Sequence, residues 1–429
     1  MNTRYTRLLA VLLALLFLLS GCGTHGKTLI EAEGTEISVN VFQLYLSRMK
    51  GSLASAGYNV NSDDFWNSYI STDHETMADH YTTQVFEGLR QIAAAMILYD
   101  ELGLKLPKNV EQSIDDWIDA LIEEVGGGSK SQLNSLLASY GANVTTLRDA
   151  SIIEAKLSQL KEHLYGAGGS LIAASAKEEF YQATYIRGYQ MQLANYYYKR
   201  DVDEDGRTVY YTDDTYKHIA YDTDGKDVIK TEELDKNGDV IYVYKTEGDE
   251  EPMVAYDAEK GVVHYHLDSN GDRTVGYYTE AEMALRLKSA EEIAKKCVDN
   301  EELFLQCIED YSDNSDFHTK YAPTGMYFSV GTYATDSIFA TFSNELAKLE
   351  EGDLAVLNSD SGYYILMRVE LDAGAWQKEE NSRWFDTLTG LTIEHMLQKR
   401  TAEYIDRVSF DEELLKTVDI RMVAANNYY

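Results

Sequence analysis

Alternating carboxylates near the middle of the chain are of the type that binds calcium. Asp201, Asp203 and Asp205 lead into Gly206, which matches the opening of a calcium-binding loop. However, Thr212 occupies the position where such a loop needs a closing bidentate glutamate. We therefore favour an acidic hairpin turn here and keep a loose calcium site as the alternative.

A pair of histidines, His264 and His266, forms the second candidate metal site. In an extended strand they would lie on one face, but no third ligand stands nearby, so a surface pair is favoured over zinc binding. The sequence also contains no G-x-S-x-G, H-E-x-x-H or phosphate-loop motif. These patterns predict neither a bound metal nor a cofactor.

Cys22 is the third residue with a specific chemistry. It follows two basic residues, Arg4 and Arg7, and an apolar run over 8–19 that is too short to span a bilayer. Leu19-Ser20-Gly21-Cys22 resembles the lipobox of bacterial lipoproteins. The resemblance implies a signal peptide over 1–21, a lipidated Cys22 and a tether over 22–27, on the extracytoplasmic face of the cell membrane. The alternatives are an ordinary signal with an incidental cysteine, or a signal anchor.

The charge of the chain excludes one class of partner. Against 72 Asp and Glu it has 38 Lys and Arg, and removal of Arg4 and Arg7 with the signal leaves 36, a formal charge of −36. Such an acidic surface repels nucleic acid and offers no basic patch to anionic lipid, so the lipid on Cys22 would hold the membrane. Cys297 and Cys307 are the other cysteines, and the sequence leaves open whether they form a disulfide.

The first part of the chain reads as helical. After an extended start over 28–41 with a turn at Gly34, amphipathic patterns continue to Gly166. The strongest pattern ends at a triple glycine and could be the core of a helical bundle or an open cradle that binds unfolded chains. Its apolar stripe consists of Val110, Ile114, Trp117, Ile118, Leu121, Ile122 and Val125.

The second part of the chain mixes strands with helices. Between Tyr189 and Thr279, short β-prone runs alternate with turns of the Asn-Gly or Asp-Gly type, which predicts hairpins. A capping box at Thr279 then opens a helical stretch, and strands, a helix and a final helix from about Trp376 to Val408 follow. The predicted turns are Asp205-Gly206, Asp224-Gly225, Asn237-Gly238 and Asn270-Gly271.

Three motifs in order resemble a parvulin-type peptidyl-prolyl isomerase domain. They are a helix with Glu302-Leu303-Phe304 and Glu309–Asp313, a strand with Gly325-Met326-Tyr327-Phe328, and a pair formed by 349–354 and 361–366. In the second motif the spacing from Gly325 to Phe328 is one residue longer than in the family. The resemblance implies a first strand at 186–195 and an insertion over 199–278.

The rest of the chain is similar to the chaperone segment of the SurA and PrsA extracytoplasmic foldases. This implies an α+β fold in which a helical chaperone domain over 28–185 is interrupted by a parvulin-like domain over 186–370 and completed by a helix within 371–429. The implied function is a membrane-anchored foldase for unfolded exported polypeptides. The alternative is a non-catalytic binding lipoprotein whose β-rich insertion docks a protein partner or a cell-wall glycan.

The resemblance also implies where a prolyl peptide would bind. An X-Pro bond isomerises over a barrier of about 20 kcal/mol, so the site must grip the proline ring and weaken the amide resonance. The family's apolar trio corresponds to Met326, Ile338 and Phe342, which could equally be core residues. At the family's polar positions the sequence has Gln190, Asn314 and Tyr364, with both histidines replaced. Although these side chains still form hydrogen bonds, we expect weak or absent catalysis.

Overall fold

The computed structural model describes residues 25–70, 75–199, 272–334 and 339–429 of the 429-residue chain, together with 268–269 and the backbone of strands between 209 and 263. The chain divides into two compact units, Met1–Thr184 with Phe385–Tyr429, and Tyr185–Trp384. Several predicted sites lie outside the described residues: Cys22, Asp201, Asp203, Asp205, His264, His266 and Ile338.

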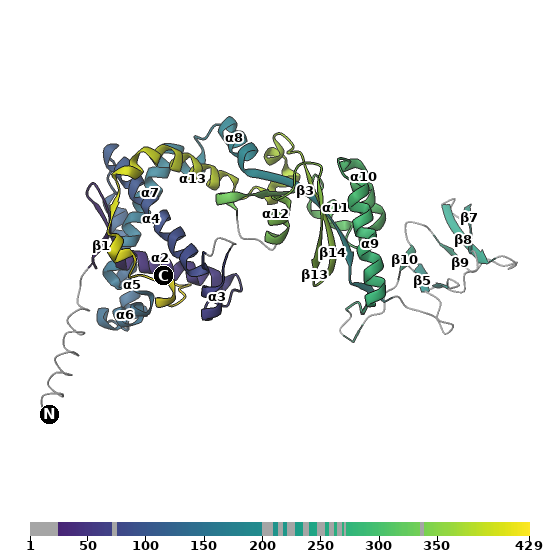
Figure 1. Cartoon of the computed structure of the whole chain (residues 1–429), viewed down its shortest axis with the longest axis horizontal. Helices are drawn as coiled ribbons and strands as arrows, with labels where there is room; N and C mark the ends of the chain where they lie inside the picture. Colours follow the sequence, from purple (N-terminus) through teal and green to yellow (C-terminus); the bar gives the residue numbers. More distant parts are fainter. Residues whose placement is uncertain are drawn as a thin grey trace, which may run out of the picture. The chain divides into compact units, whose positions relative to one another are not determined.

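The first unit is helical and is organised around α4, the longest of its described helices. The face of α4 from Leu89 to Tyr99 is almost entirely buried, because α2, α7 and the C-terminal segment all pack against it. Figure 1 shows α4 and α7 side by side beneath α13. The helices of this unit are α2 Val39–Ser55, α3 Asp63–Asn67, α4 Met77–Glu101, α5 Lys108–Glu124, α6 Lys130–Leu137, α7 Val144–Tyr165, α8 Ala174–Thr184, α13 Leu388–Thr401 and α14 Glu412–Leu415.

The two ends of the first unit meet in a small antiparallel sheet. Strands β1 (Thr28–Ala32) and β2 (Thr35–Ser38) form a hairpin, and Gly34 in its turn has φ +104°, a conformation that glycine adopts without strain. Strand β15 (Ser409–Phe410) pairs with β1 on the other side. The ring of Phe410 then packs against Phe86 of α4 at a centroid distance of 5.0 Å.

The continuous final helix predicted from about Trp376 to Val408 is wrong. Only α13 is α-helical there, and it is flanked by the 3-10 segments η4 (Ala375–Gln377), η5 (Glu379–Trp384) and η6 (Ala402–Arg407). The stretch up to Trp384 belongs to the second unit, where Asn381 is buried and accepts a hydrogen bond from the Thr324 hydroxyl. The chain therefore changes units between Trp384 and Phe385, which breaks the helix.

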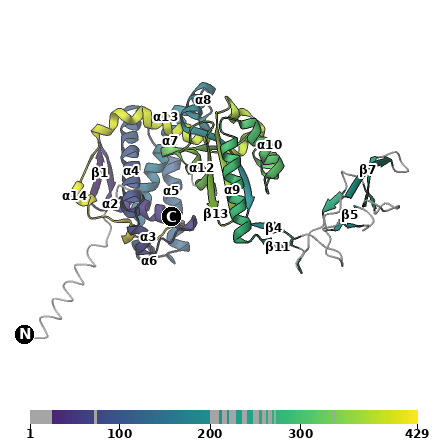
Figure 2. The ribbon, with the colours of Figure 1, turned by 45° about the vertical axis from the view of Figure 1, so that its right-hand side comes forward.

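The second unit is a four-stranded antiparallel sheet with helices on both faces. The strand order is β12-β3-β14-β13, with α9 and α10 against one face and α12 against the other (Figures 1 and 2). Gly188 lets α12 approach, because a Cβ there would lie 2.7 Å from the Leu346 side chain. The elements are β3 Tyr185–Ala194, α9 Glu280–Lys296, α10 Glu301–Tyr311, α11 Asp316–Tyr321, β12 Met326–Ser329, α12 Ala340–Leu346, β13 Leu354–Ser359 and β14 Gly362–Val369.

Strand β3 is buried on both faces, so its side chains enter two separate cores. Alternate residues of a strand point to opposite sides of the sheet. One core, beneath α9 and α10, contains Tyr189, Met191 and Leu193; the other, beneath α12, contains Ile186 and Leu366 of neighbouring β14. The sequence alternates between apolar and polar residues from Tyr189 to Leu193, yet the polar residues Gln190 and Gln192 are buried as well.

The β-rich insertion leaves the second unit through a two-stranded stem. Strand β4 (Tyr196–Tyr198) pairs antiparallel with β11 (Val275–Tyr277). Between them, described strand backbones form the sheets β10-β5-β6 and β7-β8-β9, all with antiparallel pairing. Their bounds are β5 Val209–Thr212, β6 His218–Ala220, β7 Val228–Leu234, β8 Val240–Thr246, β9 Val254–Tyr256 and β10 Gly261–Val263.

The described ranges contain neither a helix that could span a membrane nor a cluster that could bind a metal ion. No helix within them is both long and apolar enough to cross a bilayer. Within the same ranges, no three side chains of histidine, cysteine, aspartate or glutamate gather closely enough to hold a metal ion.

Candidate functional site

Four of the residues that the parvulin resemblance singled out, Gln190, Met326, Phe342 and Tyr364, lie on the α12 side of the sheet. Strand pairing sets Leu366 of β14 opposite Gln190 of β3, and Tyr364 opposite Gln192. Because these positions alternate in step, Gln190 and Tyr364 project from the same face. Met326 of β12, opposite Gly188, belongs to the core of that face.

Aromatic rings cover this face. Phe342 of α12 lies over Tyr364 with ring centroids 4.8 Å apart, and the Tyr364 hydroxyl is 3.1 Å from the hydroxyl of Ser361. Further rings continue from Phe342 at centroid distances between 5.5 and 6.3 Å. We call the set the aromatic cluster: Phe317, Phe328, Phe339, Phe342, Tyr364 and Trp384.

The members of the predicted site differ in their access to a ligand. Phe342, Tyr364 and Asn314 are half-buried, whereas Met326 has no exposed surface and acts as core in this structure. Gln190 is only 2% exposed, and its side-chain oxygen Oε1 has no hydrogen-bond partner among the described residues. An unpartnered amide oxygen in an apolar core costs free energy, and Gln190 therefore offers this face a hydrogen-bond acceptor that a ligand could use.

A histidine that the sequence analysis missed closes the edge of β3 beside this face. Strand β12 pairs with β3 only as far as Gly188, so the backbone beyond it needs other partners. His318 of α11 supplies one, because its Nε2 lies 2.6 Å from the carbonyl oxygen of Gln190. Burial lowers the pKa of His318, so the neutral ring with Nε2–H donating to that carbonyl is the favoured form.

The segment after α10 continues this edge. The Asp313 backbone N–H donates to the Gln192 carbonyl at 2.9 Å, and the Asp313 carboxylate accepts from the Ala194 N–H at 2.9 Å. Arg286 of α9 forms an ion pair with the same carboxylate. Along the half of β3 that β12 does not reach, side chains and a loop thus take the place of a neighbouring strand.

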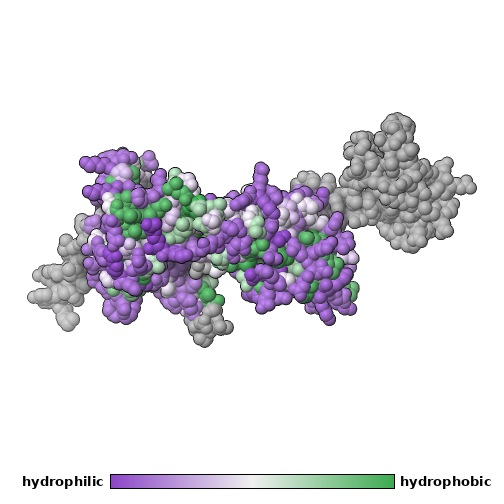
Figure 3. All heavy atoms as spheres, turned by 90° about the horizontal axis from the view of Figure 1, so that it is seen from above, coloured by the Kyte–Doolittle hydropathy of each residue, from purple (hydrophilic) through white to green (hydrophobic). Residues whose placement is uncertain are grey.

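A second candidate surface lies in the first unit, on α5 and α6. Of the apolar stripe predicted on α5, only Ile118 is buried, while Trp117 and Val125 are 38% and 40% exposed. Trp117, Leu121 and Val125 follow one another at a spacing of four and so form a row on one face of the helix. On α6, Leu136 is 50% exposed. Figure 3 shows that the face it displays carries groups of apolar residues among hydrophilic ones.

Comparisons with known proteins give structural likeness alone. No protein-family model matches the sequence, and no curated protein sequence matches it. Solved structures similar to the chain include PrsA from Bacillus subtilis, with 14% identity over 80% of this chain and 88% of that one and a TM-score of 0.19. Foldase protein PrsA from Streptococcus pneumoniae str. Canada MDR_19A gives 12% identity, coverages of 91% and 93%, and a TM-score of 0.19. Foldase protein PrsA from Lactococcus lactis gives 10%, 91% and 99%, and 0.18.

Likeness at that level establishes neither a family nor an activity for this chain. The function must therefore be argued from the two surfaces described above. The mixed helix and sheet composition, with separate small sheets, agrees with the α+β class predicted from the sequence.

Proposed function

We propose that the protein is a chaperone that binds unfolded polypeptides through the apolar row on α5, of which Trp117 and Val125 are partly exposed. The half-exposed Trp117 is the observation that carries the proposal. Tryptophan offers a large apolar area and loses little side-chain entropy when it is bound. An exposed tryptophan on a rigid helix is therefore better suited to binding a partner than to stabilising the fold.

Acidic residues of α5 and the charge of the whole chain suggest the kind of client. Asp116, Asp119 and Glu123 are exposed on α5, on the side of the helix away from the row, and the whole chain has a formal charge of −34. A segment with apolar residues flanked by lysine or arginine would match both the row and its surroundings. Such segments are exposed in unfolded chains and buried in folded ones, which would restrict binding to unfolded clients.

A second part of the proposal concerns the aromatic cluster. Phe342, Tyr364 and Trp384 offer partly exposed rings, and a proline ring packs well against aromatic faces. The cluster would hold prolyl segments, with little or no isomerase activity because Gln190 and Tyr364 stand where the resemblance implies histidines. The amide of Gln190 and the hydroxyl of Tyr364 can still form hydrogen bonds.

The third part is the location. We propose that Cys22 is lipidated and anchors the chain to the outer face of the cell membrane. A tether of this kind would raise the local concentration of the chaperone where exported chains emerge unfolded. Mass spectrometry of the N-terminal peptide from membranes tests the anchor, and a peptide that begins before Cys22 without lipid would refute it.

The chaperone proposal is tested by replacing Trp117. Trp117→Glu should weaken binding of a reduced, basic model client by about thirtyfold, because about 100 Å² of apolar contact is worth roughly 2 kcal/mol. Light scattering of the aggregating client and fluorescence anisotropy measure the effect. Gln112→Glu is the matched control, since Gln112 is exposed on the side of α5 opposite the row and this substitution adds the same negative charge. Equal loss in both variants, or none in either, would contradict the proposal.

The isomerase part has its own test. A short X-Pro peptide should isomerise at nearly its uncatalysed rate with the unmodified protein, and faster with the double variant Gln190→His, Tyr364→His. The readout is the rate of cis-to-trans exchange by NMR. If the unmodified protein accelerates exchange strongly, or if the double variant folds yet gains nothing, this part of the proposal is wrong.

A further inference from the structure

The two cysteines of the second unit face each other across a helical hairpin. Cys297 is the residue that ends α9, and Cys307 lies on α10, which begins after a short turn at Asp299 and Asn300. Their Sγ atoms are 3.9 Å apart, and both cysteines are in the thiol form. The turn is fixed, since the Asn300 N–H donates to the Cys297 carbonyl at 3.0 Å.

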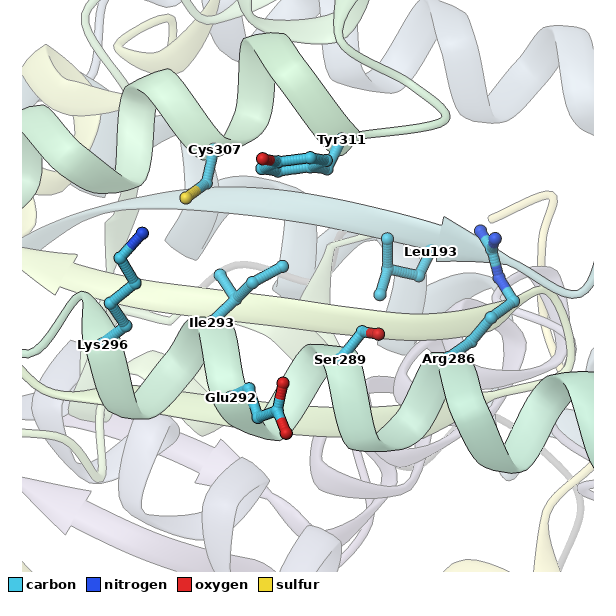
Figure 4. Close-up of a pocket in the computed structure, with 8 residues that line it drawn as sticks. All are labelled: Leu193, Arg286, Ser289, Glu292, Ile293, Lys296, Cys307 and Tyr311. Carbon is cyan, nitrogen blue, oxygen red and sulfur yellow. The ribbon is translucent and has the colours of Figure 1, made fainter.

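Only one of the two sulfurs borders open space. Cys307 lines a cavity of about 420 Å³ between α9 and α10, whose floor includes Leu193 of β3. Figure 4 shows the Cys307 sulfur pointing from α10 toward the space between the two helices, with Ile293 and Lys296 facing it from α9. Cys297 has no exposed surface. A small reagent that enters the cavity therefore meets Cys307 first.

We propose that Cys307 and Cys297 are a redox pair that closes to a disulfide by exchange with a small-molecule disulfide. The Cys307 thiolate attacks the reagent and releases one reagent thiolate, which leaves a mixed disulfide on Cys307. The Cys297 thiolate then attacks the Cys307 sulfur, forms the intramolecular bond and expels the second reagent thiolate. The pair loses two electrons to the reagent, and its two protons end on the reagent thiols.

The geometry suits the second step. The sulfurs must move from 3.9 Å to about 2.05 Å, which side-chain rotation on either helix can provide. Burial, followed by the hydrogen bond with Cys307, raises the pKa of Cys297 to about 11. Because the thiolate is the attacking form, ring closure should speed up as the pH rises toward that value.

The disulfide would affect the aromatic cluster from the opposite face of the sheet. Helix α10 packs on β3 and β14, and the residues that follow it, Ser312 and Asp313, bind the open edge of β3 next to Gln190. A disulfide from Cys297 would hold α10 to the end of α9 and so restrict this edge. The inference is separate from the proposed chaperone activity, since it depends only on the second unit.

The test uses the full chain with Cys22→Ser, so that no thiol other than this pair is present. The folded protein is incubated with oxidised glutathione, and its intact mass is measured over time at several pH values. We expect a loss of two hydrogen atoms without a glutathione adduct, faster at higher pH. The melting temperature should rise by roughly 5–10 °C, because the bond restricts the unfolded chain, even though the loop that it closes is short.

Single variants separate the two steps. Cys297→Ser should stop at a glutathione adduct on Cys307, whereas Cys307→Ser should stay unmodified while folded. A stable adduct or two free thiols on the chain that retains both cysteines would overturn the proposal, whatever the single variants do. A modified Cys297 in folded Cys307→Ser would overturn the order of attack.

Discussion

At the scale of single residues, the sequence predicted the positions that are determined by the spacing within a motif. Gly362 and Tyr363 fix the position of Tyr364, and the distance to Gly352 places Phe342; the structure brings these two rings within 4.8 Å. His318 escaped because its main partner is a backbone carbonyl 128 residues away, and any residue type can present a carbonyl. A buried contact of this kind leaves no pattern in the sequence.

The buried ring of His318 predicts how the second unit responds to acid. Burial lowers its pKa below the ordinary value of 6.5, so the folded state keeps the ring neutral while the unfolded state takes up a proton. The contribution of the neutral His318 ring to the free energy of unfolding is fully present above about pH 6.5. It is lost as the pH falls through the lowered pKa of the folded state. Unfolding in urea between about pH 7.5 and pH 5.5 should show this loss.

The variant His318→Gln isolates that response. It should cost about 1–2 kcal/mol at pH 7.5, because the hydrogen bond to the Gln190 carbonyl is lost or weakened. Its stability should then fall less on acidification than that of the unmodified protein. His163→Gln is the control, since His163 is exposed on α7. An unchanged acid response in His318→Gln would rule out the assigned cause.

At the scale of elements, periodicity found helices but not their surroundings. The stripe from Val110 to Val125 predicted α5, which the structure gives as Lys108–Glu124. Which part of the stripe is covered depends on α7 and α6, and the same amphipathic pattern is compatible with a closed bundle or an open surface. The structure leaves Trp117 and Val125 partly exposed, and this exposure carries the proposed function.

The prediction of a continuous final helix was wrong for a different reason. Residues from Ala375 to Trp384 have helix-compatible types, yet they form 3-10 turns because their side chains pack into the second unit. The ring of Trp384 packs against Phe328 at 5.5 Å and Phe339 at 5.7 Å. Tertiary packing overrides helix propensity here, and single-sequence reasoning has no access to it.

At the scale of the whole molecule, the second unit is inserted into the first. Its two ends meet, since Trp384 packs on Phe328, and Phe328 pairs with Ile186 near the start of β3. The cut ends of the first unit also meet, because the rings of Tyr181 and Phe385 are 5.5 Å apart. Neighbouring ends are the condition under which an inserted unit and its host can each fold alone.

The fragment 185–384 should therefore fold by itself, whereas a fragment that ends at 370, the boundary predicted from the sequence, should be markedly weaker. The shorter one lacks Trp384 and Asn381, so the aromatic cluster loses a ring and the Thr324 hydroxyl loses an acceptor. Loss of a fully buried tryptophan costs roughly 3–5 kcal/mol, so loss of the partly buried Trp384 should cost about 2–3 kcal/mol. Urea unfolding measures the difference.

Trp384→Ala in the longer fragment is the matched variant and should account for most of the difference in stability between the two fragments. Equal stability of the two fragments would mean that residues 371–384 contribute nothing to this unit, and a longer fragment without a cooperative transition would mean that the second unit needs its host.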